Sequence, residues 1–267
     1  MSIVVVAFDA RDHVLACLDS IAAHVGLPHE VVVVDDGSRD GTADAVRIQH
    51  PGARLVVRAR NEGLVAGRND GLRAASGRHV LMLDADTRVG PGAVEALAAV
   101  LDADPAVGLV GPRLVHPDGS LQMSCFRWPP LLLPLLRRGP YARWIDDDPP
   151  MHRRHEMRDF DHRADRPVVW LAGAAQMYRR ELAARLGPYD RRISSYGGED
   201  LDWCLRMWAA GLEVRYVAAT EIEHISQKVT RRRRFGRASL RALRDWYYIQ
   251  LKHRRLRRDP RLAAARA

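Results

Sequence analysis

Asp84 and Asp86 are the residues of this sequence with the clearest chemistry. They directly follow the apolar segment 80–83, which has the aliphatic character of a buried strand. Carboxylates at positions i and i+2 after a strand can chelate a hard divalent cation, Mg²⁺ or Mn²⁺, which bridges diphosphate oxygens and neutralises a departing phosphate. A solvated turn is the alternative, because one Asp-x-Asp pattern is weak evidence by itself.

Two more polar clusters could bind parts of a nucleotide. Asp35 and Asp36 end the apolar run 31–34, where acids can accept hydrogen bonds from a nucleobase or from ribose hydroxyls; an Asx turn leading into a helix cap is the competing interpretation. The segment 61–69 supplies glycines that let a backbone approach phosphate, and Arg68 near a helix start suits an anion. The segment is not a GxGxxG fingerprint, which disfavours a dinucleotide-binding Rossmann domain.

A third cluster begins with the glycine pair 197–198 and continues as Glu199-Asp200-Leu201-Asp202-Trp203. Acids at a helix N-terminus are stabilised by the helix dipole, which is sufficient as a structural explanation. The functional interpretation is that one of them takes a proton from an acceptor hydroxyl as general base. His224 follows a predicted strand; a lone histidine is more often structural, but beside an Asp-x-Asp pair it could complete a metal site.

The elements that must position these residues alternate over the first 110 residues. The predicted strands are 3–7, 31–34, 54–57, 80–83 and 107–110, and the predicted helices are 14–23, 42–48, 64–75 and 91–101. Short connections between them indicate βαβ units, and therefore a Rossmann-like α/β fold with a mostly parallel sheet flanked by helices. Ligands of such sheets bind beyond the carboxyl ends of the strands. The polar residues at those ends are Asp9, Asp35, Asp36, Asn61, Asp84 and Asp86.

The pattern breaks after Pro112. Residues 112–167 are rich in Pro, Arg, His and Asp, and we expect an irregular insertion on the acceptor side of the molecule. Regular patterns return in four segments: an ordered stretch at 168–177, helices at 179–186 and 199–210, and a strand at 213–217.

In this order, the motifs resemble the inverting family-2 glycosyltransferases of GT-A fold, and within them the bacterial rhamnosyltransferase-like branch. The resemblance rests on DDGS after the second strand, NEG-x3-GRN before a helix, DAD after the fourth strand, and a late GGED-x-DW followed by a histidine. It covers about residues 2–225. One departure is the end of the first strand, Ala-Phe-Asp-Ala, where the family more often has a Thr/Ser-Tyr-Asn type of sequence.

The resemblance implies a role for each site residue. The nucleoside would be held by Ala7, Phe8, Asp9, Asp35 and Asp36, and Arg68 and Asn69 would lie near the nucleotide or diphosphate. Asp86 would be the main metal ligand, Asp84 would reach ribose or metal, and His224 would be the late metal-binding histidine. Asp200 would be the catalytic base, and Gly173, Glu199 and Trp203 would line the acceptor or donor-sugar pocket.

The resemblance also implies the reaction. We expect a sugar, with rhamnose as a candidate, to move from a dTDP- or UDP-linked nucleotide sugar to a lipid-linked or glycan acceptor in cell-wall or surface-glycan synthesis. Mg²⁺ or Mn²⁺ would be the cofactor. The donor, the acceptor and the oligomeric state stay open.

Charge is concentrated near the C-terminus. The whole chain carries +9, but residues 228–258 hold 13 basic residues and one acid, Asp245, so the rest of the chain is slightly acidic. We therefore divide the chain into a catalytic domain, 1–227, and a basic tail, 228–267, with an amphipathic helix over 239–258.

The tail has three interpretations: a solvated charged helix, a segment attracted to anionic lipid headgroups, or a nucleic-acid-binding segment. Its apolar side chains favour the membrane surface, and no nucleic acid is expected. We see no signal peptide and no run of 18 apolar residues, and three cysteines without a CxxC pattern give no disulfide framework. These features indicate a cytoplasmic protein, peripheral at the inner face of the cell membrane.

Two other functions compete with glycosyl transfer. A sugar nucleotidyltransferase also uses a Rossmann-like sheet and metal carboxylates, but it usually has a glycine-rich loop after the first strand, where this chain reads Phe8-Asp9-Ala10-Arg11-Asp12. A catalytically degenerate scaffold or polyanion-binding protein is the non-enzymatic alternative. The presence of Asp86, Asp200 and His224 argues against it.

Overall fold

The computed structural model describes residues 1–132, 149–225 and 237–266. The basic residues from Lys228 to Arg234 and the acidic run 146–148 lie outside the described residues.

The N-terminal half forms four parallel strands in the order β3-β2-β1-β4. Their bounds are β1 (Ser2–Ala7), β2 (Glu30–Asp35), β3 (Arg54–Val57) and β4 (His79–Asp84). The register pairs Ala7 with Asp35 and Val6 with Asp84, so the carboxyl ends of three strands meet at one edge of the sheet. The predicted parallel sheet is therefore confirmed, and so is the expectation that the polar strand ends gather at one edge.

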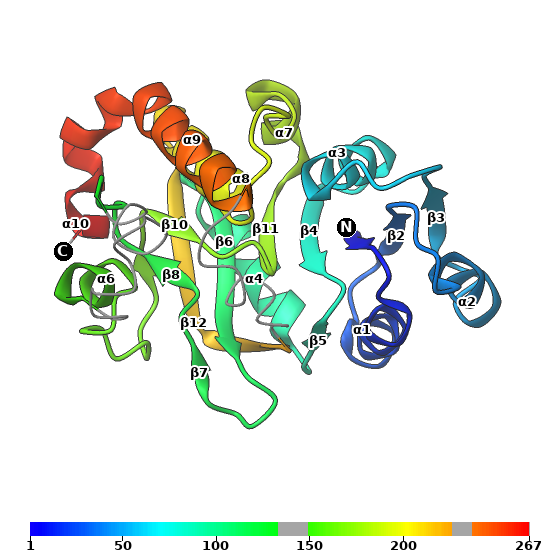
Figure 1. Ribbon diagram of the computed structural model, residues 1–267. Coiled ribbons are helices and arrows are strands. Elements are labelled where there is room, and N and C mark those ends of the chain that lie inside the picture. The colour runs from blue at the N-terminus through cyan, green and yellow to red at the C-terminus, as the bar shows by residue number, and fades with distance from the viewer. Residues whose placement is uncertain (133–148, 226–236, 267) are drawn as a thin grey trace.

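Helices cover both faces of this sheet, as the strand sequence requires. Val4 belongs to the hydrophobic core on one face and Val5 to the core on the other, which explains the continuous apolar run in β1. One face carries α1 (Arg11–His24), α2 (Thr42–Gln49) and α4 (Ala93–Ala103). The other carries α3 (Leu64–Ala74), α7 (Arg180–Leu186) and α8 (Gly198–Ala209) (Figure 1).

The C-terminal half extends the same sheet with mixed strand directions. β11 (Ala175–Arg179) is antiparallel to both β4 and β6 (Val107–Val115), β12 (Glu213–His224) is parallel to β6, and β5 (Thr87–Val89) is antiparallel to β12. β12 runs seven residues beyond the predicted strand end at Val217. This extension pairs His224 with Thr87, beside the Asp-x-Asp pair.

The segment 112–167 is more regular in its described part than the sequence predicted. It contains the end of β6, β7 (Leu121–Gln122), β8 (Cys125–Phe126), α6 (Pro150–His155) and β9 (Arg166–Pro167), and β8 pairs with β10 (Trp170–Leu171). Pro112 does not end β6, because its carbonyl points toward Ser124, away from β12, and the pairing with β11 stops at Val110. The missing N–H therefore removes no ladder bond.

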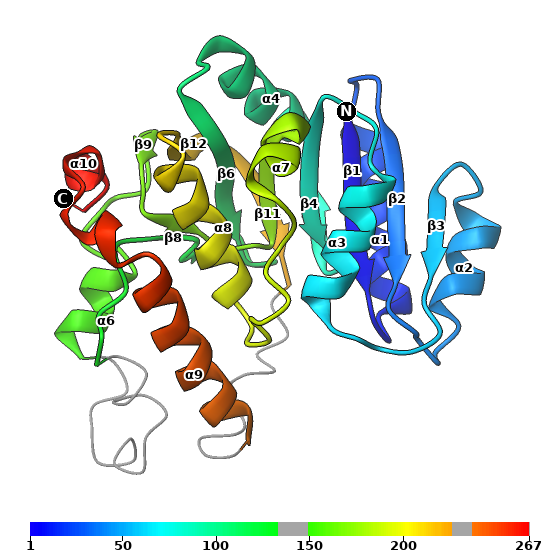
Figure 2. The ribbon, with the colours of Figure 1, turned by 90° about the horizontal axis from the view of Figure 1, so that it is seen from above.

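The predicted amphipathic helix of the tail is present as α9 (Arg237–Lys252). It gives way to 3₁₀ turns η2 (Arg254–Arg258) and η3 (Pro260–Leu262), followed by α10 (Ala263–Arg266). α9 lies along α8 with Ile249 buried in the core (Figure 2). Within the described residues, none of the helices combines the length and the apolar character needed to cross a membrane.

Candidate active site

Asp84, Asp86 and His224 come together at the carboxyl edge of the sheet. Asp84 ends β4, Asp86 lies in the turn to β5, and His224 ends β12. One ligand atom from each lies within 4.8 Å of the others, and His224 Nε2 is 3.3 Å from Asp86 Oδ1. Gln122 Oε1 lies 2.9 Å from His224 Nδ1, where it can accept that ring's proton and leave Nε2 directed at the carboxylates.

This donor set fits a divalent cation. Two carboxylates and one imidazole match the preferences of Mn²⁺, and the carboxylates alone match those of Mg²⁺. Burial raises the pKa of Asp84. Burial acts in the same direction on Asp86, but the hydrogen bond with His224 outweighs it and lowers the pKa of Asp86. Burial destabilises the charged form of a carboxyl group, and a bound cation would stabilise that charged form.

Arg68 links this cluster to the acids of α8. Its side chain is only 3% exposed, and its guanidinium donates to Asp84 at 3.2 Å, to the carbonyl of Gly173 at 3.0 Å, and to Asp200. Glu199 Oε1 lies 3.6 Å from the same guanidinium. The sequence placed Arg68 near the diphosphate; in the structure it bridges the cluster of Asp84, Asp86 and His224 and the predicted base.

The position of the Asp200 carboxylate depends on Gly173. The Gly173 N–H donates to Asp200 Oδ2 at 3.0 Å, and Arg68 holds the other oxygen. A Cβ at position 173 would lie 2.0 Å from Asp200 Oδ1, so only glycine allows this approach. Gly173, expected in the wall of the acceptor or donor-sugar pocket, lines neither of the two cavities at this site and instead contacts the predicted base directly.

A cavity of about 320 Å³, named here the donor cavity, opens above the cluster. Of the residues expected to hold the nucleoside, Ala7, Phe8 and Asp36 line it, together with Asp84 and Asp86. Asp36 also accepts hydrogen bonds from the backbone N–H groups of Glu62 and Gly63, at 3.1 and 2.9 Å. The donor cavity thus joins the predicted nucleoside and metal residues in one space.

Two other residues expected at the nucleoside, Asp9 and Asp35, are sequence neighbours of residues in this wall but do not line the donor cavity. Asp35 is buried and accepts hydrogen bonds from the Ser38 backbone and hydroxyl, the Asx turn that the sequence offered as the alternative. Asp9 has a left-handed backbone, with φ of 46°, and its carboxylate accepts the Arg39 N–H at 2.7 Å. Both carboxylates shape the loops around the donor cavity.

Asn69 was expected near the nucleotide or diphosphate and Trp203 in the wall of the acceptor or donor-sugar pocket, but neither lines the two cavities at this site. The Asn69 side chain is buried, and both ends of its amide are bonded to the backbone of Tyr189, at 3.0 and 2.8 Å. Trp203 is completely buried and stacks on the Tyr189 ring. These two residues fix the segment that leads into α8, which is a structural function.

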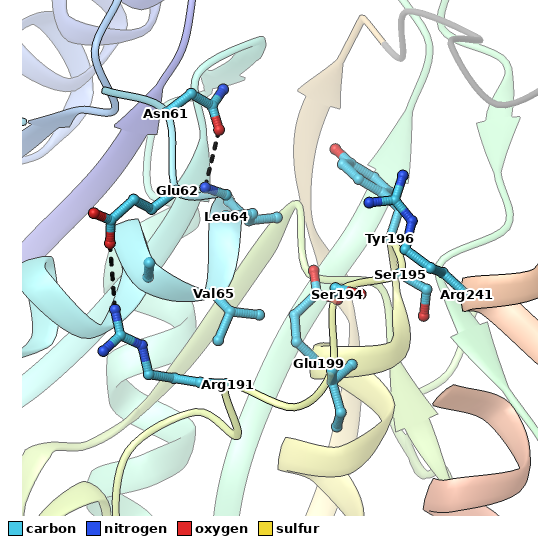
Figure 3. Close-up of a pocket in the computed structure, with 13 residues that line it drawn as sticks. Asn61, Glu62, Leu64, Val65, Arg191, Ser194, Ser195, Tyr196, Glu199 and Arg241 are labelled. Carbon is cyan, nitrogen blue, oxygen red and sulfur yellow. Dashed lines mark hydrogen bonds and ion pairs between the residues drawn. The ribbon is translucent and has the colours of Figure 1, made fainter. Parts of the chain in front are cut away.

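Glu199, by contrast, lines a second cavity of about 400 Å³, as expected for a pocket residue. This cavity lies beside the donor cavity, between the loop preceding α3 and the loop preceding α8 (Figure 3). Tyr196 borders both cavities, and its hydroxyl lies 3.4 Å from Asp84 Oδ2. Tyr196 and Gln122 were not predicted from the sequence; the position of Tyr196 directly before the GGED motif was the available signal.

Comparisons with known proteins identify the family of the chain. The model of glycosyl transferase family 2 matches residues 2–187. The N-acetylglucosaminyl-diphospho-decaprenol L-rhamnosyltransferase of Mycobacterium tuberculosis is 28% identical over 243 residues, which is 84% of this chain and 75% of that protein. The succinoglycan biosynthesis protein ExoO of Rhizobium meliloti is 36% identical over 141 residues, half of this chain and 40% of that protein.

Solved structures show the same architecture. A mannosyltransferase from Pyrobaculum calidifontis, in complex with GDP-Man and Mn²⁺, superposes with a TM-score of 0.58 at 23% identity, over 85% of this chain and 57% of that one. GalNAc-T7 with UDP, GalNAc and Mn²⁺ gives a TM-score of 0.62 at 18% identity, over 84% of this chain and 43% of that one. The chain thus spans about half the length of these solved chains, and the likeness concerns the fold. From the family match and the shared fold, we conclude that the chain belongs to glycosyl transferase family 2 and has the GT-A fold.

Proposed function

We propose that this chain transfers a sugar from a nucleotide-diphosphate sugar to a hydroxyl of a lipid-linked or polysaccharide acceptor, with inversion at the anomeric carbon. The observation that carries the proposal is the Arg68 bridge, which couples a cation-binding cluster, Asp84, Asp86 and His224, to the carboxylate of Asp200. A site for a leaving diphosphate and a site for a departing proton are therefore held in one rigid arrangement.

The donor side of the reaction is assigned to the donor cavity. Ala7, Phe8 and Asp36 would contact the nucleoside, and Asp84, Asp86 and His224 would hold Mg²⁺ or Mn²⁺. A cation bound there would neutralise the negative charge that develops on the leaving diphosphate. The similarity to a protein named as a rhamnosyltransferase supports dTDP-rhamnose as the donor, with UDP-sugars as the alternative.

The acceptor side centres on Asp200. Its carboxylate, oriented by Gly173 and Arg68, accepts the proton of the acceptor hydroxyl. The acceptor oxygen forms its bond to the anomeric carbon while the bond from that carbon to the diphosphate breaks. One displacement inverts the stereocentre and needs one base, whereas a retaining double displacement would also need a nucleophile.

Replacing the base tests this assignment. Asp200→Asn is expected to leave Mn²⁺-dependent nucleotide binding within about threefold and to reduce transfer by about 10²–10⁴-fold, the usual range for a general base. Asp12→Asn, an exposed acid of α1, is the matched control and should keep full activity. Transfer by Asp200→Asn at close to the wild-type rate would show that the base is another residue.

We also propose that the protein acts in cell-wall or surface-glycan synthesis, as a cytoplasmic protein peripheral at the inner face of the cell membrane. The support is an exposed apolar patch on α9, where Leu240 and Leu251 are 61% and 62% exposed. Tyr247 lies between them in sequence and donates a hydrogen bond to the carbonyl of Leu131, which is itself exposed. Basic residues flank the patch, which suits anionic headgroups.

Vesicle binding tests the membrane proposal. Leu240→Ser with Leu251→Ser should weaken cosedimentation with phosphatidylglycerol vesicles at least about fivefold, because each buried apolar side chain contributes about 1.5–3 kcal/mol. Ile48→Ser, on the distant helix α2 and 77% exposed, is the control for a changed apolar surface. Equal binding by the double variant and the wild type would contradict this attachment.

A further inference from the structure

The second cavity carries two arginines that the reaction above does not use. Arg191 reaches it from the loop between α7 and α8, and Arg241 reaches it from α9. In Figure 3 the two side chains approach from different walls, Arg191 near Glu62 and Arg241 near Tyr196. None of the three candidate metal ligands lines this cavity.

Both guanidinium groups have hydrogen-bond donors to spare. Arg191 makes one weak contact, 3.5 Å to Glu62, and its side chain is 70% exposed. That carboxylate is already held by Arg58 at 2.6 Å and lies 3.4 Å from Arg60, so it cannot neutralise Arg191 fully. Within residues 1–132, 149–225 and 237–266, no carboxylate pairs with Arg241.

The loop that forms the cavity wall is held in place by α9. Asp245 is buried and accepts the backbone N–H groups of Ser194 and Ser195, each at 2.8 Å. Arg244, next to the cavity, is bonded to Asp245, to Ser194 and to the Arg192 carbonyl, so its donors are used in this scaffold. The cavity is therefore preformed, and Arg191 and Arg241 are the arginines in its wall with free donors.

Glu199 is the acidic residue in the wall of the second cavity nearest Asp200, and we do not expect its carboxyl group to repel a bound anion. Glu199 is 2% exposed, and its Oε1 has no hydrogen-bond partner among the described residues. Burial and the neighbouring Asp200 raise the pKa of Glu199, which favours its neutral form. This buried carboxyl lies beside the base, and its Oε1 makes no hydrogen bond and only the 3.6 Å contact with Arg68, so it can bond to a sugar hydroxyl.

We propose that the second cavity binds the phosphate or diphosphate of the acceptor through Arg191 and Arg241, with the acceptor sugar between these arginines and Asp200. Guanidinium groups bind phosphate oxygens with paired, charge-assisted hydrogen bonds, and two of them match the charge of a diphosphate. The inference rests on the proposed function, and it assigns the chemical class of acceptor: a phosphate-linked sugar.

Pyrophosphate binding to the full chain, measured by calorimetry in EDTA, tests the arginine pair without the donor metal. The double variant Arg191→Gln with Arg241→Gln should weaken pyrophosphate binding about tenfold or more. Arg60→Gln removes a neighbouring exposed arginine outside the cavity wall and should leave binding within about twofold. Because both arginines are exposed, we expect the double variant to have the melting temperature of the wild type, which would verify that it is folded.

Several results would overturn the inference. Pyrophosphate binding that is unchanged in the double variant, or equally weakened in Arg60→Gln, places the anion elsewhere. Loss of phosphatidylglycerol-vesicle binding with intact pyrophosphate binding would assign the arginines to membrane lipid headgroups instead. Failure of the proposed function is distinguishable, because it appears as no Mn²⁺-dependent stabilisation of the wild type by any nucleotide diphosphate.

Discussion

Replacing Gly173 with alanine should remove catalysis while leaving the fold intact. The Cβ of an alanine would lie 2.0 Å from Asp200 Oδ1 and 2.3 Å from its Cγ, whereas ordinary contact begins at 3.4 Å. The carboxylate must therefore move by about 1.4 Å. Because the clash involves the end of a side chain rather than backbone, rotation of Asp200 can relieve it.

The magnitude follows from what that rotation breaks. Asp200 loses its bond from the Gly173 N–H and its contact with Arg68, and it no longer points where the acceptor proton leaves. A displacement of about 1 Å in a reacting group can cost about 100-fold in rate, so kcat should fall at least that far. The free energy of unfolding should fall by only about 1–3 kcal/mol, as for other overpacked sites.

Release of nucleotide diphosphate during turnover is the assay, with Mn²⁺-dependent donor binding measured in parallel. Gly173→Ala should bind the donor nucleotide like the wild type and turn over at 1% of the rate or less. Gly52→Ala, where an added Cβ meets nothing within 4 Å, is the matched control. A folded Gly173→Ala variant with kcat within threefold of the wild type would refute the assignment of Asp200 as the oriented base.

Three further outcomes follow from the contacts around α8. Asn69→Ala should lower the free energy of unfolding by about 2–3 kcal/mol, because two buried backbone groups of Tyr189 lose their partners. The same variant should keep the donor KM within twofold. A raised KM with unchanged stability would show that Asn69 binds the substrate. His253→Ala should lower the free energy of unfolding by about 1–3 kcal/mol in chemical denaturation, because it removes one 2.8 Å partner of buried Asp202. No loss would mean that the bond between His253 and Asp202 does not stabilise α8. Burial favours a higher pKa for Asp202, but bonds from His253 and Lys252 outweigh burial and lower the pKa. The contribution of Asp202 to the free energy of unfolding is therefore present above the unfolded pKa, near 4, and is lost as pH falls further. A denaturation series from pH 7 to pH 3 should show the wild type losing its advantage in stability over His253→Ala.

The sequence predicted most of the sheet and the grouping of Asp84, Asp86 and His224, for identifiable reasons. Runs such as 3–7 and 80–83 are continuously apolar and rich in aliphatic residues, as is typical of a parallel strand buried on both faces. Parallel strands place their carboxyl ends together, so Asp84 and Asp86 were predicted at the correct edge. The proximity of His224 to these carboxylates was predicted from the order of the motifs. Its structural cause is the extension of β12 along β5.

What the sequence missed concerns the direction of side chains and long-range partners. Asn69 and Trp203 belong to the right motifs, but neighbouring residues of a helix point about 100° apart. Trp203, five positions along α8, also lies about 7.5 Å from the start of that helix. Both side chains therefore face Tyr189 rather than a cavity. The pairing of Asp202 with His253 joins positions 51 residues apart, which no local pattern reports.

The most direct test of the account measures thermal stabilisation by dTDP, UDP and GDP, each with and without Mn²⁺, in the wild type and in Asp86→Ala. A ligand that binds only the native state raises the melting temperature by mass action. The account predicts a Mn²⁺-dependent rise with dTDP or UDP in the wild type and no such rise in Asp86→Ala. No rise with any nucleotide diphosphate, or an equal rise in Asp86→Ala, would contradict a metal-assisted donor site at Asp84, Asp86 and His224.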